Sequence, residues 1–165
     1  MGSTLLLVLL GASTGCARRH YANQVLTKPE VSYRIGELPP GWRKVALSDN
    51  DLAFSWGNTG HVLAVNSTCE GHDDPSLEVL TRHLLMGFTE PEEVSRETVM
   101  LDGREALRSR HQAKMDGVPV ELLLLVLKKD NCVYDFSYVA PQGRLEEHEA
   151  DFESLVGGFH VERTS

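Results

Sequence analysis

The apolar segment Val118–Leu127 constrains the fold more than any other stretch of the chain. A strand that is apolar on both faces must be covered on both sides. Two further strand patterns flank it, Arg104–Met115 and Cys132–Ala140, and the turns between the three are Asp116-Gly117 and Asp130-Asn131. Both pairs tolerate the positive φ of two-residue hairpin turns. The sequence therefore predicts a three-stranded meander within a sheet that is buried on both faces.

Turns of two residues also predict the register of this meander. The first turn pairs Met115 with Val118, Ala113 with Val120 and His111 with Leu122. The second turn sets three aromatic residues against three leucines, which gives the pairs Tyr134–Leu127, Phe136–Leu125 and Tyr138–Leu123. One face of the predicted sheet is therefore rich in leucine and aromatic side chains.

Two helices are predicted, and they provide the cover that the sheet needs. Leu77, Leu80, Leu84, Leu85 and Phe88 recur at helical spacing. Asp74-Pro75 is expected to start this helix, since Asp is a good N-cap and Pro suits the first helical position. A second helix carries Leu145, Phe152, Leu155, Val156 and Phe159 and ends at Gly157-Gly158. With 165 residues, the chain is long enough for one domain, an α+β fold with a mostly antiparallel sheet flanked by helices.

The first sixteen residues resemble the export signal of a bacterial lipoprotein. The apolar run that starts at Leu5 is too short to span a bilayer, and Ser13-Thr14-Gly15-Cys16 is similar to a lipoprotein cleavage site. The resemblance implies that Cys16 carries lipid, including palmitate, after the preceding peptide is removed. We expect a signal peptide over residues 1–15, a lipid-anchored tether over 16–30 and a single domain over 31–165. The alternative is that the leucine run is a buried strand or helix of the domain.

These features predict the location and the partners. A lipoprotein would face the periplasm and bind membrane lipid through Cys16, and Ala17 resembles the residue that follows the cysteine in lipoproteins sorted to the outer membrane. The formal charge of −8 argues against binding of nucleic acid. We expect an unidentified protein of the cell envelope as the partner.

Four landmarks resemble the Mog1/PsbP-like family, and more narrowly small uncharacterised bacterial lipoproteins that carry this fold. They are Leu38–Trp42, Met100–Leu107, Val133–Tyr138 and Gly158–Val161. The resemblance implies an α/β/α sandwich and a class of accessory and binding proteins. It transfers no functional residue to a position in this chain, and fold alone is weak evidence for function.

No catalytic residue set is found by motif, so we predict a protein that is not an enzyme and has no cofactor and no metal. The chain lacks a Gly-x-Ser-x-Gly elbow and a phosphate-binding loop. The competing hypothesis is a metal-dependent protein or enzyme that uses Cys69, His72 and Asp73. A third possibility is a carrier of a small apolar ligand, with a cleft between the aromatic sheet face and the helix at Leu77–Phe88. His148 and His160 flank the last helix, and we expect both to be exposed.

Cys69 and Cys132 lie near strand ends, and an exported protein would meet an oxidising compartment. A disulfide between them is one interpretation. Two separate cysteines that behave as small apolar residues are the other, because the sequence cannot give the distance between their Cα atoms.

Overall fold

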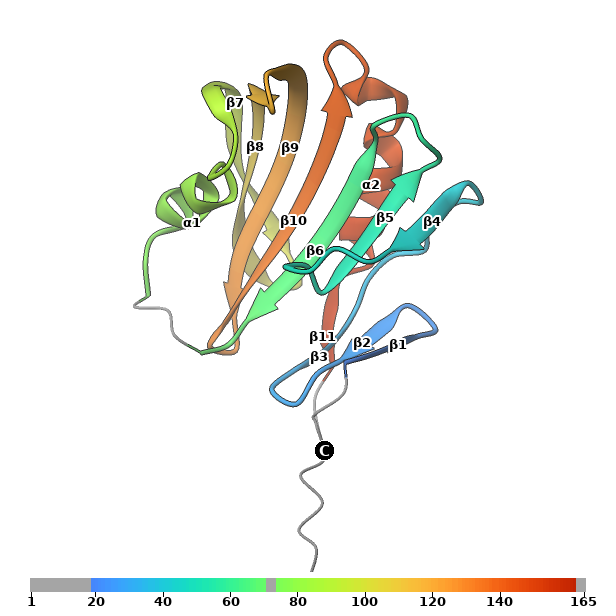
Figure 1. The fold of residues 1–165 in the computed structure, drawn as a ribbon. Helices are drawn as coiled ribbons and strands as arrows, with labels where there is room; N and C mark the ends of the chain where they lie inside the picture. The colour runs from blue at the N-terminus through green and yellow to red at the C-terminus, as the bar shows by residue number, and fades with distance from the viewer. Residues whose placement is uncertain (1–18, 71–73, 163–165) are drawn as a thin grey trace, which may run out of the picture.

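The computed structural model describes residues 19–70 and 74–162 (Figure 1). Its main feature is an antiparallel sheet of seven strands. In spatial order the strands are β4 (Trp42–Val45), β5 (Leu52–Trp56), β6 (Val62–Thr68), β10 (Cys132–Pro141), β9 (Val118–Lys129), β8 (Arg104–Met115) and β7 (Thr89–Leu101). The predicted meander is confirmed as β8, β9 and β10. It lies inside the sheet, with β6 beyond β10 and the exposed edge strand β7 beyond β8.

The predicted register of the meander is also confirmed. Met115 pairs with Val118 and His111 with Leu122 across the first turn. Across the second turn, Tyr134 pairs with Leu127 and the other two aromatic residues follow in step. Asp116, Gly117, Asp130 and Asn131 all have positive φ, which the two hairpin turns require.

A smaller sheet contradicts the predicted tether. Its strands, in spatial order, are β1 (His20–Ala22), β2 (Val25–Thr27), β3 (Ser32–Arg34) and β11 (His160–Glu162). The first two lie inside residues 16–30, and Leu26 is only 1% exposed. Strands of three residues are too short for an alternating pattern to be visible in the sequence. Cys16 and the leucine run before it lie outside the described residues.

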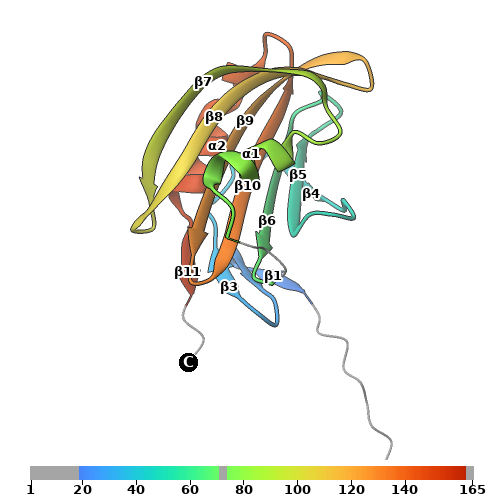
Figure 2. The same cartoon turned by 90° about the vertical axis from the view of Figure 1, so that its left-hand side faces the viewer.

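Two helices cover opposite faces of the main sheet (Figures 1 and 2). Helix α1 (Leu77–Leu84) packs on β8 and β9, whereas α2 (Glu149–Gly157) follows the short 3-10 helix η1 (Leu145–Glu147) and covers the other face. Helix α1 begins two residues later than the Asp74-Pro75 prediction implied. Its N-cap is Ser76, whose Oγ accepts from the backbone N–H of Val79 at 3.4 Å, because Asp74 has a φ of 45° and binds Lys128 instead.

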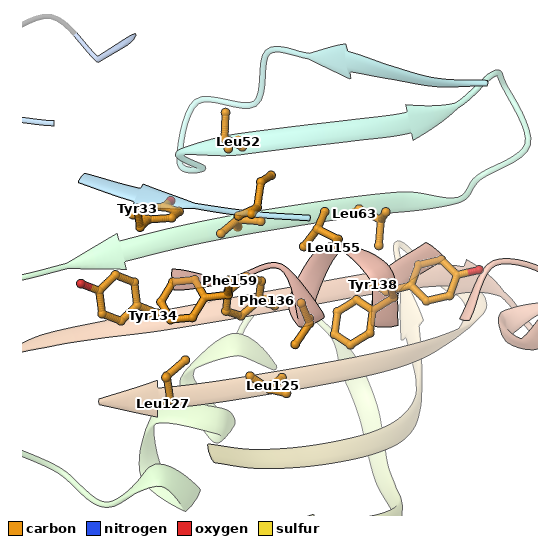
Figure 3. Packing of buried hydrophobic residues seen from close by; sticks show 14 of the residues in the cluster. Tyr33, Leu52, Leu63, Leu125, Leu127, Tyr134, Phe136, Tyr138, Leu155 and Phe159 are labelled. Carbon is orange, nitrogen blue, oxygen red and sulfur yellow. The ribbon is translucent and has the colours of Figure 1, made fainter. Parts of the chain in front are cut away.

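The larger hydrophobic core lies between the main sheet, α2 and the small sheet (Figure 3). Tyr33, Phe136 and Phe159 are central to it, and the Phe159 ring lies 5.3 Å from the Phe136 ring. Gly36 lets β3 leave the small sheet directly against α2, because a Cβ there would overlap the backbone of Ser154. The predicted fold class is confirmed: an α+β fold with a mostly antiparallel sheet between helices. None of the helices in the described part of the chain is long and apolar enough to cross a bilayer.

Candidate functional site

Three side chains with metal-ligating atoms meet at the end of the sheet where β5 turns into β6. They are His61, Glu147 and His148, and their ligand atoms all lie within 4.8 Å of one another. His61 directly precedes β6, Glu147 ends η1, and His148 links η1 to α2. In Figure 1 this end is the upper one, where the β5–β6 turn and η1 come together. We call these three residues the rim cluster.

His61 is the buried member of the rim cluster, with a side chain that is 0% exposed. Its Nδ1 lies 2.9 Å from the hydroxyl of Tyr138. Its Nε2 is buried without a hydrogen-bond partner and lies 3.6 Å from Oε2 of Glu147. Burial lowers the pKa of His61, with smaller contributions from His148 and Arg144, so the ring is neutral near pH 7. A neutral ring whose Nδ1–H donates to Tyr138 leaves a lone pair on Nε2.

The other two members of the rim cluster also have a partner behind them. Nδ1 of His148 lies 2.8 Å from Oδ2 of Asp151. Arg144 donates to both carboxylate oxygens of Glu147, at 2.7 and 2.8 Å, and lowers the pKa of that carboxyl. Each of the three potential ligands is therefore oriented by a second side chain.

Two tryptophans form the wall beside His148. Its ring centroid is 4.4 Å from that of Trp56 and 5.3 Å from that of Trp42. Trp42 also donates from Nε1 to Oδ2 of Asp151 at 2.9 Å, so it fixes the carboxylate that orients His148. The His148 side chain is only 13% exposed. The prediction of an exposed His148 is therefore wrong, because the stretch between η1 and α2 turns the ring inward against the tryptophans.

The opposite end of β6 holds the two cysteines named from the sequence. Sγ of Cys69 lies 2.11 Å from Sγ of Cys132, and their Cα atoms are 4.0 Å apart, so the structure joins them in a disulfide. A sulfur in a disulfide is not a thiolate and cannot ligate a metal as one. The hypothesis that a metal binds Cys69, His72 and Asp73 therefore loses its cysteine, while His72 and Asp73 lie outside the described residues.

The cleft proposed for an apolar ligand is not formed. Tyr134, Phe136 and Tyr138 face α2, whereas α1 packs on the other face of the sheet, against Leu122 and Leu124. The prediction placed the aromatic face and α1 on one side because the spacing of a helix does not say which face it covers. The cavity beside α1 has a volume of about 320 Å³ and is lined mostly by polar side chains: Glu78, Thr81, Arg82, Glu93, Arg96, Leu107 and His111.

Two further histidines stand apart from the rim cluster. His111 is 3% exposed, and its Nε2 lies 2.9 Å from Oγ of Ser109, as expected for a packed residue. His160 has a side chain that is 61% exposed, which confirms the prediction for it, and its Nδ1 lies 2.8 Å from Asp102. His160 thus has an acidic partner as His148 does, but it lies at the end of the molecule where β11 and the small sheet are found.

No family model and no curated protein match the sequence. Solved structures do match. The cyanobacterial PsbP protein CyanoP of Synechocystis has a TM-score of 0.58 at 18% identity, covering 93% of this chain and 99% of that one. LpqN of Mycobacterium tuberculosis, which is involved in cell envelope biogenesis, has a TM-score of 0.57 at 11% identity, covering 81% and 86%. A Pseudomonas aeruginosa protein of unknown function with a suggested regulatory role has a TM-score of 0.53 at 15% identity, covering 90% and 98%.

The chain therefore has a PsbP-like fold. The neighbours named above are described as a PsbP protein, a protein involved in cell envelope biogenesis and a suggested regulator, and none of these three descriptions names an enzyme. At these identities the likeness shows the fold alone, and no residue of the rim cluster is carried over from any of them.

Proposed function

We propose that the protein is a lipoprotein of the bacterial cell envelope, anchored through lipid on Cys16, whose PsbP-like domain binds another envelope component without catalysing a reaction. The observation that carries this proposal is the order of the parts. A short apolar run ends at a cysteine, and a body with the same fold as the envelope-biogenesis protein LpqN begins almost at once.

The position of Arg19 limits the distance between such an anchor and the folded body. Arg19 already belongs to the body, because its guanidinium donates to Asn50 O at 2.6 Å and pairs with Asp51 at 3.2 Å. Arg19 is the third residue after Cys16, and three residue steps can span at most about 11 Å. A lipid on Cys16 would therefore hold the small sheet close to the membrane surface, and the rim cluster at the far end of the main sheet would face away from it (Figure 1).

Labelled palmitate tests the anchor. We expect the label to enter the wild-type chain and to be absent from Cys16→Ala, because the thiol is the acceptor of the lipid. The matched control is the double change Cys69→Ala with Cys132→Ala, which leaves Cys16 in place and should still be labelled. Label in Cys16→Ala, or a native protein that still begins at Met1, would contradict the anchor.

Co-purification from native envelopes tests the binding role. The bait is the wild-type chain, and the outer membrane is the expected fraction. An envelope protein recovered with wild type, and retained by a purified unlipidated Cys16→Ala chain, would support a binding role of the domain itself. Recovery of lipid alone would leave the anchor intact but would contradict the binding role.

A further inference from the structure

We propose that the rim cluster is a binding site for a divalent transition-metal ion, best suited to Zn²⁺, with Nε2 of His61, a ring nitrogen of His148 and a carboxylate oxygen of Glu147 as ligands. Among the described residues, these three form the group of histidine and carboxylate side chains close enough to hold one ion. Two imidazoles and one carboxylate are a common ligand set of zinc sites that keep a fourth position open.

The orphaned nitrogen of His61 is the observation that points to a ligand. A buried polar atom without a hydrogen bond is costly, so native proteins rarely leave one unpaired without a reason. In the described part of the chain, one other buried side-chain atom lacks a partner, the hydroxyl of Tyr134. That residue lines a cavity of about 350 Å³ beside Asp130 and Glu162, where no histidine joins it. Of these two unpaired atoms, only the His61 nitrogen lies in a group of three side chains whose metal-ligating atoms are all within 4.8 Å of one another.

The distances suit an ion after a small movement. Ligand atoms that bind Zn²⁺ at about 2.0–2.2 Å in a tetrahedron stand about 3.4 Å apart. Nε2 of His61 and Oε2 of Glu147 are already 3.6 Å apart. All three ligand atoms lie within 4.8 Å of one another, so movements of about an ångström would bring the group to this spacing. Because Nδ1 of His148 is taken by Asp151, Nε2 is the nitrogen that remains for the ion.

The partners behind the ligands are those that metal sites use. A ligating histidine usually donates its other ring N–H to a carboxylate or another acceptor, which fixes the tautomer. Here Tyr138 stands behind His61 and Asp151 behind His148. Arg144 holds Glu147 and would reduce the affinity by its charge, but its side chain is 44% exposed, so water screens it. We therefore expect the site to bind the ion with moderate affinity.

Zinc titration of the purified, untagged chain after removal of metals with EDTA tests the proposal. We expect one Zn²⁺ per chain with a Kd of about 1 μM or below. His148→Ala and His61→Leu should each weaken binding by more than the roughly 10–100-fold that outer partners are worth, and Asp151→Asn should fall within that range. Co²⁺ in place of Zn²⁺ should give the visible absorption of a four-coordinate site, and His148→Ala should abolish it.

Two histidine variants are the matched controls. His160→Ala removes an exposed histidine that also pairs with an aspartate, and His72→Ala tests the competing hypothesis of a metal on Cys69, His72 and Asp73. Both should bind Zn²⁺ within about twofold of wild type. Circular dichroism checks the fold of each variant; if His61→Leu does not fold, His148→Ala decides, since that side chain lies at the rim. Absence of saturable binding to wild type, or equal binding by wild type and His148→Ala, would overturn the proposal.

Discussion

The two ends of strand β6 bury polar side chains in opposite ways. Near its last residues, the carboxylate of Asp51 accepts from Lys28 and Tyr33 and from both the backbone N–H and the hydroxyl of Ser67. Before its first residue, His61 is equally buried but uses one ring nitrogen and leaves the other unpaired. In Figure 3 the hydroxyls of Tyr134 and Tyr138 point toward opposite ends of the core; that of Tyr138 bonds to His61, and that of Tyr134 has no partner among the described residues.

This difference in hydrogen bonding distinguishes a polar cluster that stabilises the fold from a potential ligand-binding site. A buried charge that is fully hydrogen-bonded fixes the fold and has nothing left to offer a ligand. At the Asp51 end, Lys28 ties the loop before β3 to the main sheet through Asp51 and through Ser67 O at 2.7 Å. At the His61 end, three metal-ligating side chains come together, and one of their atoms, Nε2 of His61, has no hydrogen-bond partner in the described part of the chain. The predictions below test this contrast by stability in EDTA, from the largest expected effect to the smallest.

Asp51→Ala should cause the largest loss of stability, about 3–5 kcal/mol in the free energy of unfolding. Removing the carboxylate leaves Lys28, whose side chain is only 17% exposed, without its charged partner, and the buried N–H of Ser67 without an acceptor. Denaturation in guanidinium chloride measures the loss. Asp49→Ala, an exposed carboxylate two residues away, is the control and should stay within about 0.5 kcal/mol of wild type. Equal effects of the two variants would mean that the Asp51 cluster does not fix the fold.

Opening the disulfide should have the next largest effect. Cys69 and Cys132 are 63 residues apart in sequence, and a closed loop of that size typically stabilises by about 2–4 kcal/mol. Cys69→Ala with Cys132→Ala should lose this amount, and the loss should match that of wild type under reduction. The Cys16→Ala chain, denatured without reductant, should contain no titratable thiol. Two thiols in that experiment would show that the bridge is absent in solution.

Asp135 is intermediate between Asp51, which accepts several hydrogen bonds, and the unpaired nitrogen of His61. Its carboxylate accepts one hydrogen bond, from Asn66 at 3.2 Å. Burial raises its pKa to about 6, with Asp51 adding to the shift. The folded chain therefore keeps a proton between about pH 4 and 6 that the unfolded chain has released. The stability that this proton contributes is full below about pH 4 and is lost as the pH rises through about 6.

Asp135→Asn should remove this pH dependence while keeping an oxygen for Asn66. The variant should be about as stable as wild type near pH 4 and more stable by up to about 3 kcal/mol at about pH 8, where wild type buries a charge. Urea unfolding across this range measures the difference, and NMR titration of the Asp135 carboxyl locates its pKa directly. A difference between variant and wild type that is the same at all pH values would contradict the raised pKa.

The sequence could predict the elements whose physics is local, and it failed where contacts are distant. The meander followed from turn chemistry at Asp116-Gly117 and from alternating side chains, so its register was correct. The β1–β2 hairpin was missed because such short strands are fixed by pairing with β3 and β11 rather than by their own pattern. The rim cluster was missed for the same reason: His61 and Tyr138 lie 77 residues apart. The adjacent Glu147-His148 pair was the one available signal, and His148 was expected to be exposed.

The smallest effect is expected at the His61 end, and it is the most discriminating. His61→Leu combined with Tyr138→Phe removes both members of a buried polar pair, and apolar replacements of both partners are often close to neutral. Since Nε2 of His61 has no partner to lose, the double variant should stay within about 1 kcal/mol of wild type in EDTA. At the other end, Asp51→Leu with Ser67→Ala makes the same kind of exchange but leaves Lys28 and Tyr33 without their hydrogen-bond acceptor, so the variant should lose several kcal/mol of stability.

Excess Zn²⁺ should raise the unfolding temperature of wild type and leave that of the His61→Leu, Tyr138→Phe variant unchanged, because only a folded chain with the site intact gains from binding. If the two double variants lose the same free energy of unfolding in EDTA, the His61 end stabilises the fold as much as the Asp51 end does. The unpaired nitrogen of His61 would then not indicate a ligand.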